Sequence, residues 1–305
     1  MLSAQPIKSL LSVMLLSATQ FVCAQGNDYM PVIPHFIMGI YLPSVNDEIN
    51  MTDIRVAMDY WLKELTADMN VVEGHAEFFM DMHEMAQSFN AKKLDMISAP
   101  ALSIVKHFAM NDLSDGYAGV RTQGRLNSLV LLTKNDAAIT GLANLRGKRL
   151  LMPNNDELSE IFIDGQTRQL FHTGYKQFFG SVDMNTKNSR MVLDLFFGKA
   201  DAVLVYLSTY DVMVELNPQI KSNTKILLSY PLSSRSYGFF RREFLEEYQL
   251  RQPLKDFLAK IAEHPKLQEI LVLFKTEAIV PVTIQELTPL RKMYEDYLKL
   301  NPVEK

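Results

Sequence analysis

The chain has 305 residues and a formal net charge of −4 at pH 7, and it is 48% hydrophobic and 22% charged. This composition excludes a long disordered, collagen-like or coiled-coil chain, and the length predicts about two domains. Because the 31 basic residues do not exceed the 35 acidic ones, we expect no nucleic-acid partner held through its phosphate backbone.

The first residues are typical of an export signal. Lys8 precedes a short apolar stretch at 9–18, and small residues precede a cleavage point after Ala24. The apolar stretch is too short to span a bilayer. We therefore expect residues 1–24 to be a cleaved signal peptide and the mature chain to be periplasmic, without a membrane span. Cys23, the single cysteine, would leave with the signal. An uncleaved anchor and an N-terminal helix of the fold remain alternatives.

Strand-like and helix-like segments then alternate. An apolar, β-branched stretch at 32–42 predicts a buried strand. Residues 53–66 have apolar side chains at helical spacing, with charges on the other face, which predicts an amphipathic helix. The next predicted elements are a strand at 70–79, a helix at 81–90, a strand at 94–99 and a helix that begins after Pro100.

The alternation continues to the end of the chain. Strands are predicted at 126–133, 148–152, 201–206 and 225–229, and helices at 157–173 and 191–197, with a short amphipathic piece at 139–146. The tail at 254–300 is expected to be helical, with a break around 280–282. Strands that alternate with helices predict α/β architecture with mostly parallel sheets.

One local pattern occurs twice. Residues 88–96 end a helix, present lysines to solvent and enter a strand through Asp95, and residues 195–202 do the same through Asp201. This internal similarity predicts two similar lobes, although two ordinary helix-to-strand turns would also look alike.

No catalytic or metal-binding motif is recognisable. The chain lacks HExxH, paired CxxC, EF-hand, GxSxG, GxGxxG and Walker motifs, and its cysteine lies in the predicted signal. Two histidines, His75 and His83, have the acidic neighbours Glu77 and Asp81, but the expected strand end separates the two pairs. We therefore expect no enzyme activity, no bound metal and no cofactor.

Polar and aromatic residues gather where the predicted strands end. In open α/β sheets, ligands bind beyond the carboxyl ends of strands, close to helix N-termini. Each residue alone is more often an ordinary cap or turn residue, but their occurrence in both halves predicts a cleft for a small ligand. These candidate ligand-binding residues are Tyr41, Ser98, Asn154, Asp156, Glu157, Ser189, Arg190, Tyr206 and Tyr230.

Five stretches of the chain carry a resemblance to a known family. They are 39–43, 93–100, 129–136 with 142–150, 198–202, and 226–232. In this order they resemble the phosphate/phosphite/phosphonate-binding family of ABC-transporter substrate-binding proteins. The phrase at 142–150 is common to type II periplasmic-binding proteins in general.

The resemblance implies the type II periplasmic-binding-protein architecture: two lobes, each a mostly parallel sheet flanked by helices, joined by two crossing strands. Residues 28–122 and 212–305 would form the first lobe and 123–211 the second, and a hinge motion would bury a small ligand between them. By family position, Tyr41, Ser98, Asp201 and Tyr206 are expected in the cleft. Ala99 lies in the matching strand-to-helix turn and joins the candidate ligand-binding residues.

The chain departs from the family in the turn after residue 152. The family has a Ser-Thr-Ser-Gly type of turn whose hydroxyls and amides hold phosphonate oxygens, whereas this chain has Asn154, Asn155, Asp156 and Glu157. A carboxylate about 4 Å from a bound anion costs roughly 4 kcal/mol per pair of charges at an effective dielectric constant of about 20. The sequence therefore disfavours a phosphate or phosphonate dianion. The carboxylates could instead cap a helix or bind an amine, and Arg190 could pair with an acidic group.

Two functions remain open at this point. The first is a periplasmic solute-binding protein that closes on a small polar ligand, for ABC uptake or for signalling to a membrane sensor such as a histidine kinase or a diguanylate cyclase. The second is a protein–protein regulator with a vestigial cleft, which could dock on a partner through the amphipathic tail at 290–300. That tail could equally pack on the first lobe.

Overall fold

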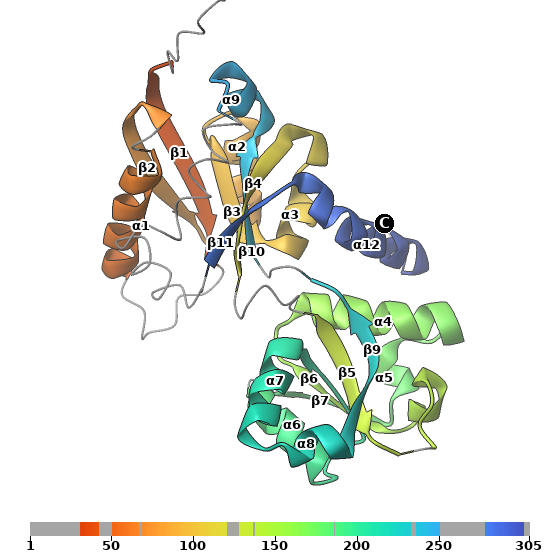
Figure 1. Cartoon of the computed structure of the whole chain (residues 1–305). Helices are drawn as coiled ribbons and strands as arrows, with labels where there is room; N and C mark the ends of the chain where they lie inside the picture. The colour runs from red at the N-terminus through yellow and green to blue at the C-terminus, as the bar shows by residue number, and fades with distance from the viewer. Residues whose placement is uncertain are drawn as a thin grey trace, which may run out of the picture. The chain divides into compact units, whose positions relative to one another are not determined.

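The structure is a computed structural model. It describes residues 31–42, 51–66, 69–120, 128–136, 138–185, 187–232, 236–250 and 278–301. The predicted signal peptide and the part of the predicted helical tail before residue 278 lie outside the described residues. The described part contains two sheets, each flanked by helices (Figure 1), which confirms the predicted α/β class. We call each sheet with its helices a lobe.

The sheet of the first lobe has six strands in the order β11-β4-β10-β3-β1-β2. Their bounds are β1 (Ile33–Tyr41), β2 (Val71–Phe79), β3 (Met96–Pro100), β4 (Leu113–Val120), β10 (Ser236–Arg241) and β11 (Ala278–Val282). β1 is parallel to both β2 and β3, while β10 is antiparallel to β3 and to β4. Tyr41, Phe79, Pro100 and Ser236 therefore lie along one edge of this sheet.

Helices of the first lobe form where apolar side chains recur at helical spacing. They are α1 (Met51–Thr66), α2 (Met82–Asn90), α3 (Ala101–His107), α9 (Arg242–Glu247) and α12 (Thr288–Leu300), with the short 3-10 helices η2 (Met110–Asp112) and η5 (Ile284–Leu287). In α1, Met58, Trp61 and Leu62 are buried, and the Trp61 ring lies 5.4 Å from the ring of Tyr117 in β4. Through this contact, α1 packs against the sheet.

The sheet of the second lobe has five strands in the order β7-β6-β8-β5-β9. Their bounds are β5 (Leu129–Lys134), β6 (Arg149–Pro153), β7 (Ser181–Asn185), β8 (Ala202–Tyr206) and β9 (Thr224–Tyr230). β6 is parallel to β7 and β8, whereas β5 is antiparallel to β8 and β9. The carboxyl ends of β6, β7, β8 and β9 therefore lie along one edge with the start of β5.

Helices flank the second sheet as well. They are α4 (Glu157–Phe171), α5 (Tyr175–Phe178), α6 (Asn188–Phe196), α7 (Leu207–Leu216) and α8 (Gln219–Asn223), with the 3-10 helix η3 (Leu142–Leu145). All five side chains of β8 are buried, as its unbroken apolar run predicts for a strand covered on both faces. Among the described residues, no helix has both the length and the apolar character that crossing a membrane requires.

Two connections join the sheets, one from β4 to β5 and one from β9 to β10. The family resemblance implies a return to the first lobe at residue 212. However, β9 pairs with β5 and forms an edge of the second sheet, so the return follows Tyr230.

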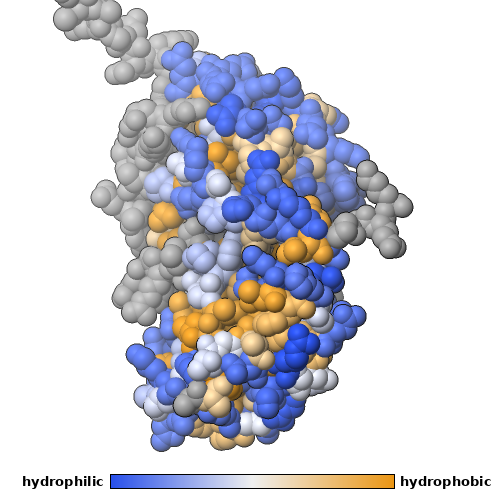
Figure 2. All heavy atoms as spheres, turned by 90° about the vertical axis from the view of Figure 1, so that its right-hand side faces the viewer, coloured by the Kyte–Doolittle hydropathy of each residue, from blue (hydrophilic) through white to orange (hydrophobic). Residues whose placement is uncertain are grey.

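Figure 2 views the side on which β9 forms this edge and shows a band of hydrophobic side chains across the second lobe. Ile226 of β9 is 45% exposed.

Several elements differ from the sequence prediction. β4, β7 and β10 were not predicted, and the amphipathic segment 139–146 contains the 3-10 helix η3. Glycine and polar residues interrupt the apolar pattern of β4 and β10, yet these glycines have a packing role. A Cβ on Gly116 would collide with the backbone of Gly238, so the two strands meet at glycines. The expected break at 280–282 belongs to strand β11.

Candidate functional site

The candidate ligand-binding residues are best understood from the sheet edges. In the first lobe, β4 ends at the same edge as β1 and β3, and the connection to the second lobe leaves from there. In the second lobe, β5 begins at the edge where β6 and β8 end. Carboxyl ends of parallel strands are where α/β sheets bind ligands. The topology therefore makes these two edges the candidate site.

On the first lobe, Tyr41 is the last residue of β1 and is half-buried against the apolar core. Ser98 lies within β3, opposite Ile40 of β1, and is also half-buried. Successive side chains of a strand point to opposite faces, so Ser98 and Ala99 do not share a face. Ala99 is 2% exposed and belongs to the core. Of this pair, Ser98 has the side chain that can bind a ligand.

On the second lobe, Tyr206 and Tyr230 lie on either side of the same residue of β5. Both pair with Leu129, so their side chains point to the same face of the sheet, with Cα atoms about 10 Å apart across two strand spacings. The ring of Phe162 in α4 lies 5.8 Å from the ring of Tyr230, which shows that α4 covers this face. The sheet register thus brings two predicted residues together.

The hydroxyl of Tyr230 is an unusual polar group. Within the part of the chain that the structure describes, its oxygen is buried and has no hydrogen-bond partner. Burial raises the pKa of Tyr230 to about 12, because the phenolate is disfavoured away from water. A buried hydroxyl without a partner is destabilising by about 1–3 kcal/mol. A ligand that hydrogen-bonds to this oxygen would remove the penalty.

The turn after β6 contains the predicted acidic residues. Asn154 and Asn155 are exposed there, and Asn155 adopts a left-handed φ of 54°. Asp156 caps α4, because its Oδ2 accepts a hydrogen bond from Ser159 Oγ at 3.1 Å and its Oδ1 lies 3.5 Å from the Ser159 amide nitrogen. Glu157 forms an ion pair with Lys106, at 2.6 Å between Oε1 and Nζ. The helix-capping alternative therefore describes Asp156.

Ser189 and Arg190 lie in the first turn of α6 and are exposed. The Arg190 Nε atom is 3.7 Å from Oδ2 of Asp194, one turn further along the same helix. The adjacent Asn188 was not predicted. Its amide oxygen is buried and, among the described residues, lacks a hydrogen-bond partner, so it is a further polar group that a ligand could satisfy.

Asp201 is not brought together with Tyr206. It precedes β8 and Tyr206 ends it, and five residues of extended chain span about 16 Å. Its carboxylate accepts hydrogen bonds from Arg149 Nε at 3.0 Å, Arg149 Nη2 at 3.1 Å and the Arg149 amide at 2.9 Å. Asp201 thus links the starts of β6 and β8, at the edge opposite the candidate site.

Lys106 is a residue near the site that the sequence did not reveal. It lies in the last turn of α3, beside His107, and its partner Glu157 is 51 positions away in the sequence. The His107 ring meets the ring of His83 edge-on at 4.9 Å. Burial, followed by the charges of His83 and Lys106, lowers the pKa of His107. No local spacing signals a cluster that forms only across elements.

Metal binding finds no support in the described residues. In those ranges, no group of three or more His, Cys, Asp or Glu side chains is arranged to hold a metal ion. The polar groups at the two edges are hydroxyls, amides and oppositely charged side chains that pair with one another, together with the tyrosine and asparagine oxygens described above. This chemistry suits hydrogen bonding to a small polar molecule.

Comparison with known proteins places these features in context. The family model described as "ABC transporter, phosphonate, periplasmic substrate-binding protein" matches residues 42–287. No curated protein matches the chain.

Solved structures share the fold at low sequence identity. XAC2383 from Xanthomonas citri bound to chloride ion is 14% identical with a TM-score of 0.56, and the match covers 87% of this chain and 98% of that one. The same protein bound to ATP is 13% identical with a TM-score of 0.55, covering 89% and 99%. PhnD1 from Prochlorococcus marinus in complex with methylphosphonate is 16% identical with a TM-score of 0.54, covering 88% and 99%.

Proposed function

The chain belongs to the family of periplasmic substrate-binding proteins of phosphonate ABC transporters, and we propose that it binds a small polar solute between the facing edges of its two sheets and presents it to an ABC permease. The observation that supports this site most is the pairing of Tyr206 and Tyr230 with one residue of β5, on the edge next to the connections between the sheets. Cleavage of residues 1–24 would release the mature chain into the periplasm. No catalytic step is proposed.

The charges near the start of α4 indicate the kind of ligand. Asp156 occupies the Ser159 amide, which an oxyanion would otherwise use, and it adds a negative charge of its own. Two nearby cations, Lys106 and Arg190, already have the partners Glu157 and Asp194. A dianion bound at this turn would therefore meet a carboxylate and no free cation of this set. We propose a zwitterionic solute whose cationic group approaches Asp156.

Two phosphonates, one with an amine and one without, test the proposal. Isothermal titration of the mature chain with methylphosphonate and 2-aminoethylphosphonate should show at least about tenfold tighter binding of the amine-bearing compound, equivalent to about 1.4 kcal/mol. Asp156→Ser should reduce this preference and improve methylphosphonate binding, because serine keeps the helix cap but removes the charge.

A matched control variant separates the effect of the charge at Asp156 from the effect of the net charge of the chain. Asp136 caps a turn just beyond the end of β5, at the opposite edge of the second sheet, where its Oδ1 accepts from the Ala138 amide at 2.9 Å. Asp136→Ser should leave both affinities unchanged. The proposed ligand class would be contradicted if the unaltered chain bound methylphosphonate as tightly as 2-aminoethylphosphonate, or more tightly. It would also be contradicted if Asp156→Ser had the same affinities as Asp136→Ser.

The regulator alternative relied on the amphipathic tail. That tail is α12, in which Leu290 is buried and Met293, Tyr294 and Tyr297 pack against the core. Its apolar side is therefore used within the chain, which favours solute binding over docking through this helix. Signalling to a histidine kinase or a diguanylate cyclase receives no support from the comparisons, so delivery to a permease is the partner we propose.

A further inference from the structure

Helix α4 of the second lobe contacts two helices of the first lobe. Its first residue, Glu157, pairs with Lys106 of α3. Two turns further along, Asp164 meets the hydroxyl of Tyr297 in α12, and the Tyr297 ring lies against Gly165, where an added Cβ would be 3.8 Å from the ring. Glu157 and Asp164 are seven residues apart and thus lie on one face of α4. That face is turned toward the first lobe.

The partner surface on the first lobe is continuous. α12 packs against α3 and η5 of its own lobe and against α4 of the other. One apolar cluster includes Leu287 and Leu290 of the first lobe together with Ile161 and Phe162 of α4. The lobes are therefore joined by side-chain contacts as well as by the two chain connections.

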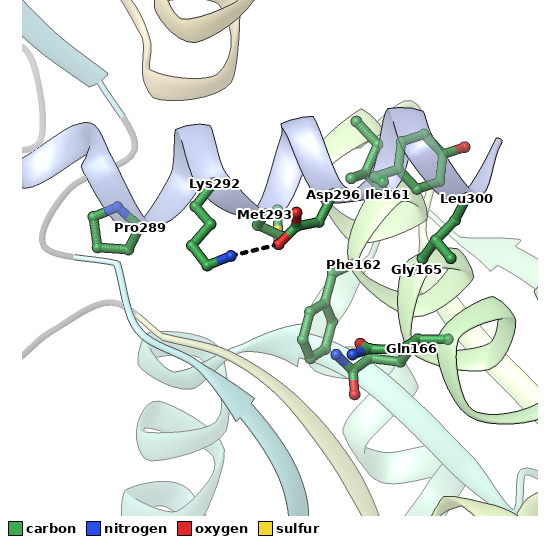
Figure 3. Close-up of a pocket in the computed structure, with 11 residues that line it drawn as sticks. Ile161, Phe162, Gly165, Gln166, Pro289, Lys292, Met293, Asp296 and Leu300 are labelled. Atoms are coloured by element: carbon green, nitrogen blue, oxygen red, sulfur yellow. Dashed lines mark hydrogen bonds and ion pairs between the residues drawn. The ribbon is translucent and has the colours of Figure 1, made fainter. Parts of the chain in front are cut away.

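The contact between α4 and α12 is only partly packed. A pocket of about 250 Å³ separates the two helices along part of their length (Figure 3). Side chains from both helices line it, and Lys292 and Asp296 form an ion pair along its α12 wall, at 2.9 Å. Fully packed interiors contain few voids larger than a water molecule. This interface is consequently less closely packed than a domain interior, which lowers the free-energy cost of separating the two helices.

The side chain of Asp164 is held in place by hydrogen bonds within the second lobe. Its side chain is 7% exposed and accepts hydrogen bonds from Arg168 Nε at 2.6 Å and from the Tyr175 amide at 2.9 Å. These bonds lie within the second lobe, so they persist if the lobes move apart. Tyr297 is the partner that belongs to the first lobe. Its hydroxyl also accepts a hydrogen bond from Asn301 Nδ2 at 3.1 Å. The Tyr297 hydroxyl would therefore keep one hydrogen bond after its contact with Asp164 breaks.

From this arrangement we propose that α12 is a releasable strap: it holds the second lobe through the Tyr297–Asp164 contact, and this contact must break or slide when the lobes change their separation. The strap needs no ligand, so it goes beyond the solute-binding role and can be tested without it.

The distance between the lobes shows directly whether α12 holds them together. Val72 of β2 and Leu216 of α7 are 72% and 75% exposed, so cysteines at these positions can carry spin labels with little disturbance in a chain that lacks Cys23. Electron–electron double resonance on the ligand-free protein gives the distribution of label distances. Tyr297→Ala should widen that distribution about twofold, because the lobes would then be joined mainly by the chain connections, and Tyr297→Phe should widen it less.

The control variant is Leu298→Ala. Leu298 is the neighbour of Tyr297 on α12, is 39% exposed and does not line the pocket, so its loss should leave the distribution unchanged. A Tyr297→Ala distribution equal to that of the unaltered chain would overturn the proposal, as would an equal widening by Leu298→Ala. If circular dichroism shows that Tyr297→Ala is unfolded, Tyr297→Phe combined with Lys106→Gln decides the question by the same two criteria.

Discussion

The two lobes hold an aspartate in the same backbone arrangement. In the first lobe, the Asp95 amide donates to the Ile37 carbonyl at 2.8 Å, and its Oδ2 accepts from the Ile37 amide at 2.9 Å. In the second lobe, Asp201 forms the same two bonds with Arg149, at 3.1 and 2.9 Å. Each carboxylate also binds a guanidinium, that of Arg241 in the first lobe and that of Arg149 in the second.

The surroundings of the two aspartates differ. Asp95 and Arg241 are each 13% exposed, whereas Asp201 is 31% and Arg149 48% exposed. Burial raises the pKa of Asp95, while hydrogen bonds from Arg149 lower the pKa of Asp201. One bonding pattern thus has two energetic outcomes. Both aspartates lie where strands begin, so this repeat belongs to the scaffold, and the proposed ligand site lies at the opposite edges.

The largest expected effect is in the first lobe. Asp95→Ala leaves the Arg241 guanidinium buried without its partner, which should lower the free energy of unfolding by about 3 kcal/mol, as measured by urea denaturation. The double variant Asp95→Leu with Arg241→Met should recover most of this loss, because no buried charge remains. A single variant within about 1 kcal/mol of the unaltered chain would show that burial does not distinguish the two sites.

The same change in the second lobe should matter less. Asp201→Ala leaves Arg149 half-exposed to water, so the loss in unfolding free energy should be about 1 kcal/mol or below. Urea denaturation under identical conditions gives the ratio of the two losses. If Asp201→Ala were as destabilising as Asp95→Ala, solvent exposure would not explain the contrast.

A further pair of variants compares the scaffold of the second lobe with its candidate site. Tyr230→Phe removes a buried hydroxyl without a partner and should raise the unfolding free energy of the ligand-free chain by up to about 1 kcal/mol. Tyr175→Phe removes a hydroxyl that is 3.1 Å from Glu160 Oε2 and should lower it by a similar amount. Thermal unfolding of both variants reports the signs, and a destabilised Tyr230→Phe would contradict the interpretation.

The smallest expected effect is a difference in pH dependence. A raised pKa means that the folded chain binds the Asp95 proton more tightly, so the stability from this group falls as pH rises above the ordinary value of 3.8. A lowered pKa means that the contribution of Asp201 grows as pH rises toward 3.8 and is lost as pH falls through its folded value. Urea denaturation of the unaltered chain, Asp95→Asn and Asp201→Asn between about pH 3 and pH 6 should give difference profiles of opposite slope. Parallel profiles would contradict the assigned directions.

Local patterns in the sequence predicted the features that depend on residues close together in the chain. The alternation of strands and helices predicted the α/β class, and the repeat at Asp95 and Asp201 corresponds to a real structural equivalence. The arginine partners could not be predicted, because Arg241 lies 146 positions from Asp95 and Arg149 lies 52 from Asp201. Strand β4 was hidden by glycines that allow close packing of backbones.

The candidate site was predictable only in part. The sequence placed Tyr206 and Tyr230 at strand ends, but their common neighbour Leu129 follows from the antiparallel register of β5, which no local pattern specifies. Asp201 was expected in the cleft by family position, and the strand direction sets it at the opposite edge. Tyr297, on which the strap depends, looked like an ordinary apolar position of an amphipathic helix.

Amide hydrogen exchange with and without 2-aminoethylphosphonate tests the central claim, a ligand held between the edges of both sheets. Exchange in the ligand-bound chain should be slower in both lobes at once: around Ser98 in β3, and around Tyr206 at the end of β8. Protection confined to one lobe, or protection at the pocket between α4 and α12 with neither strand end affected, would contradict it.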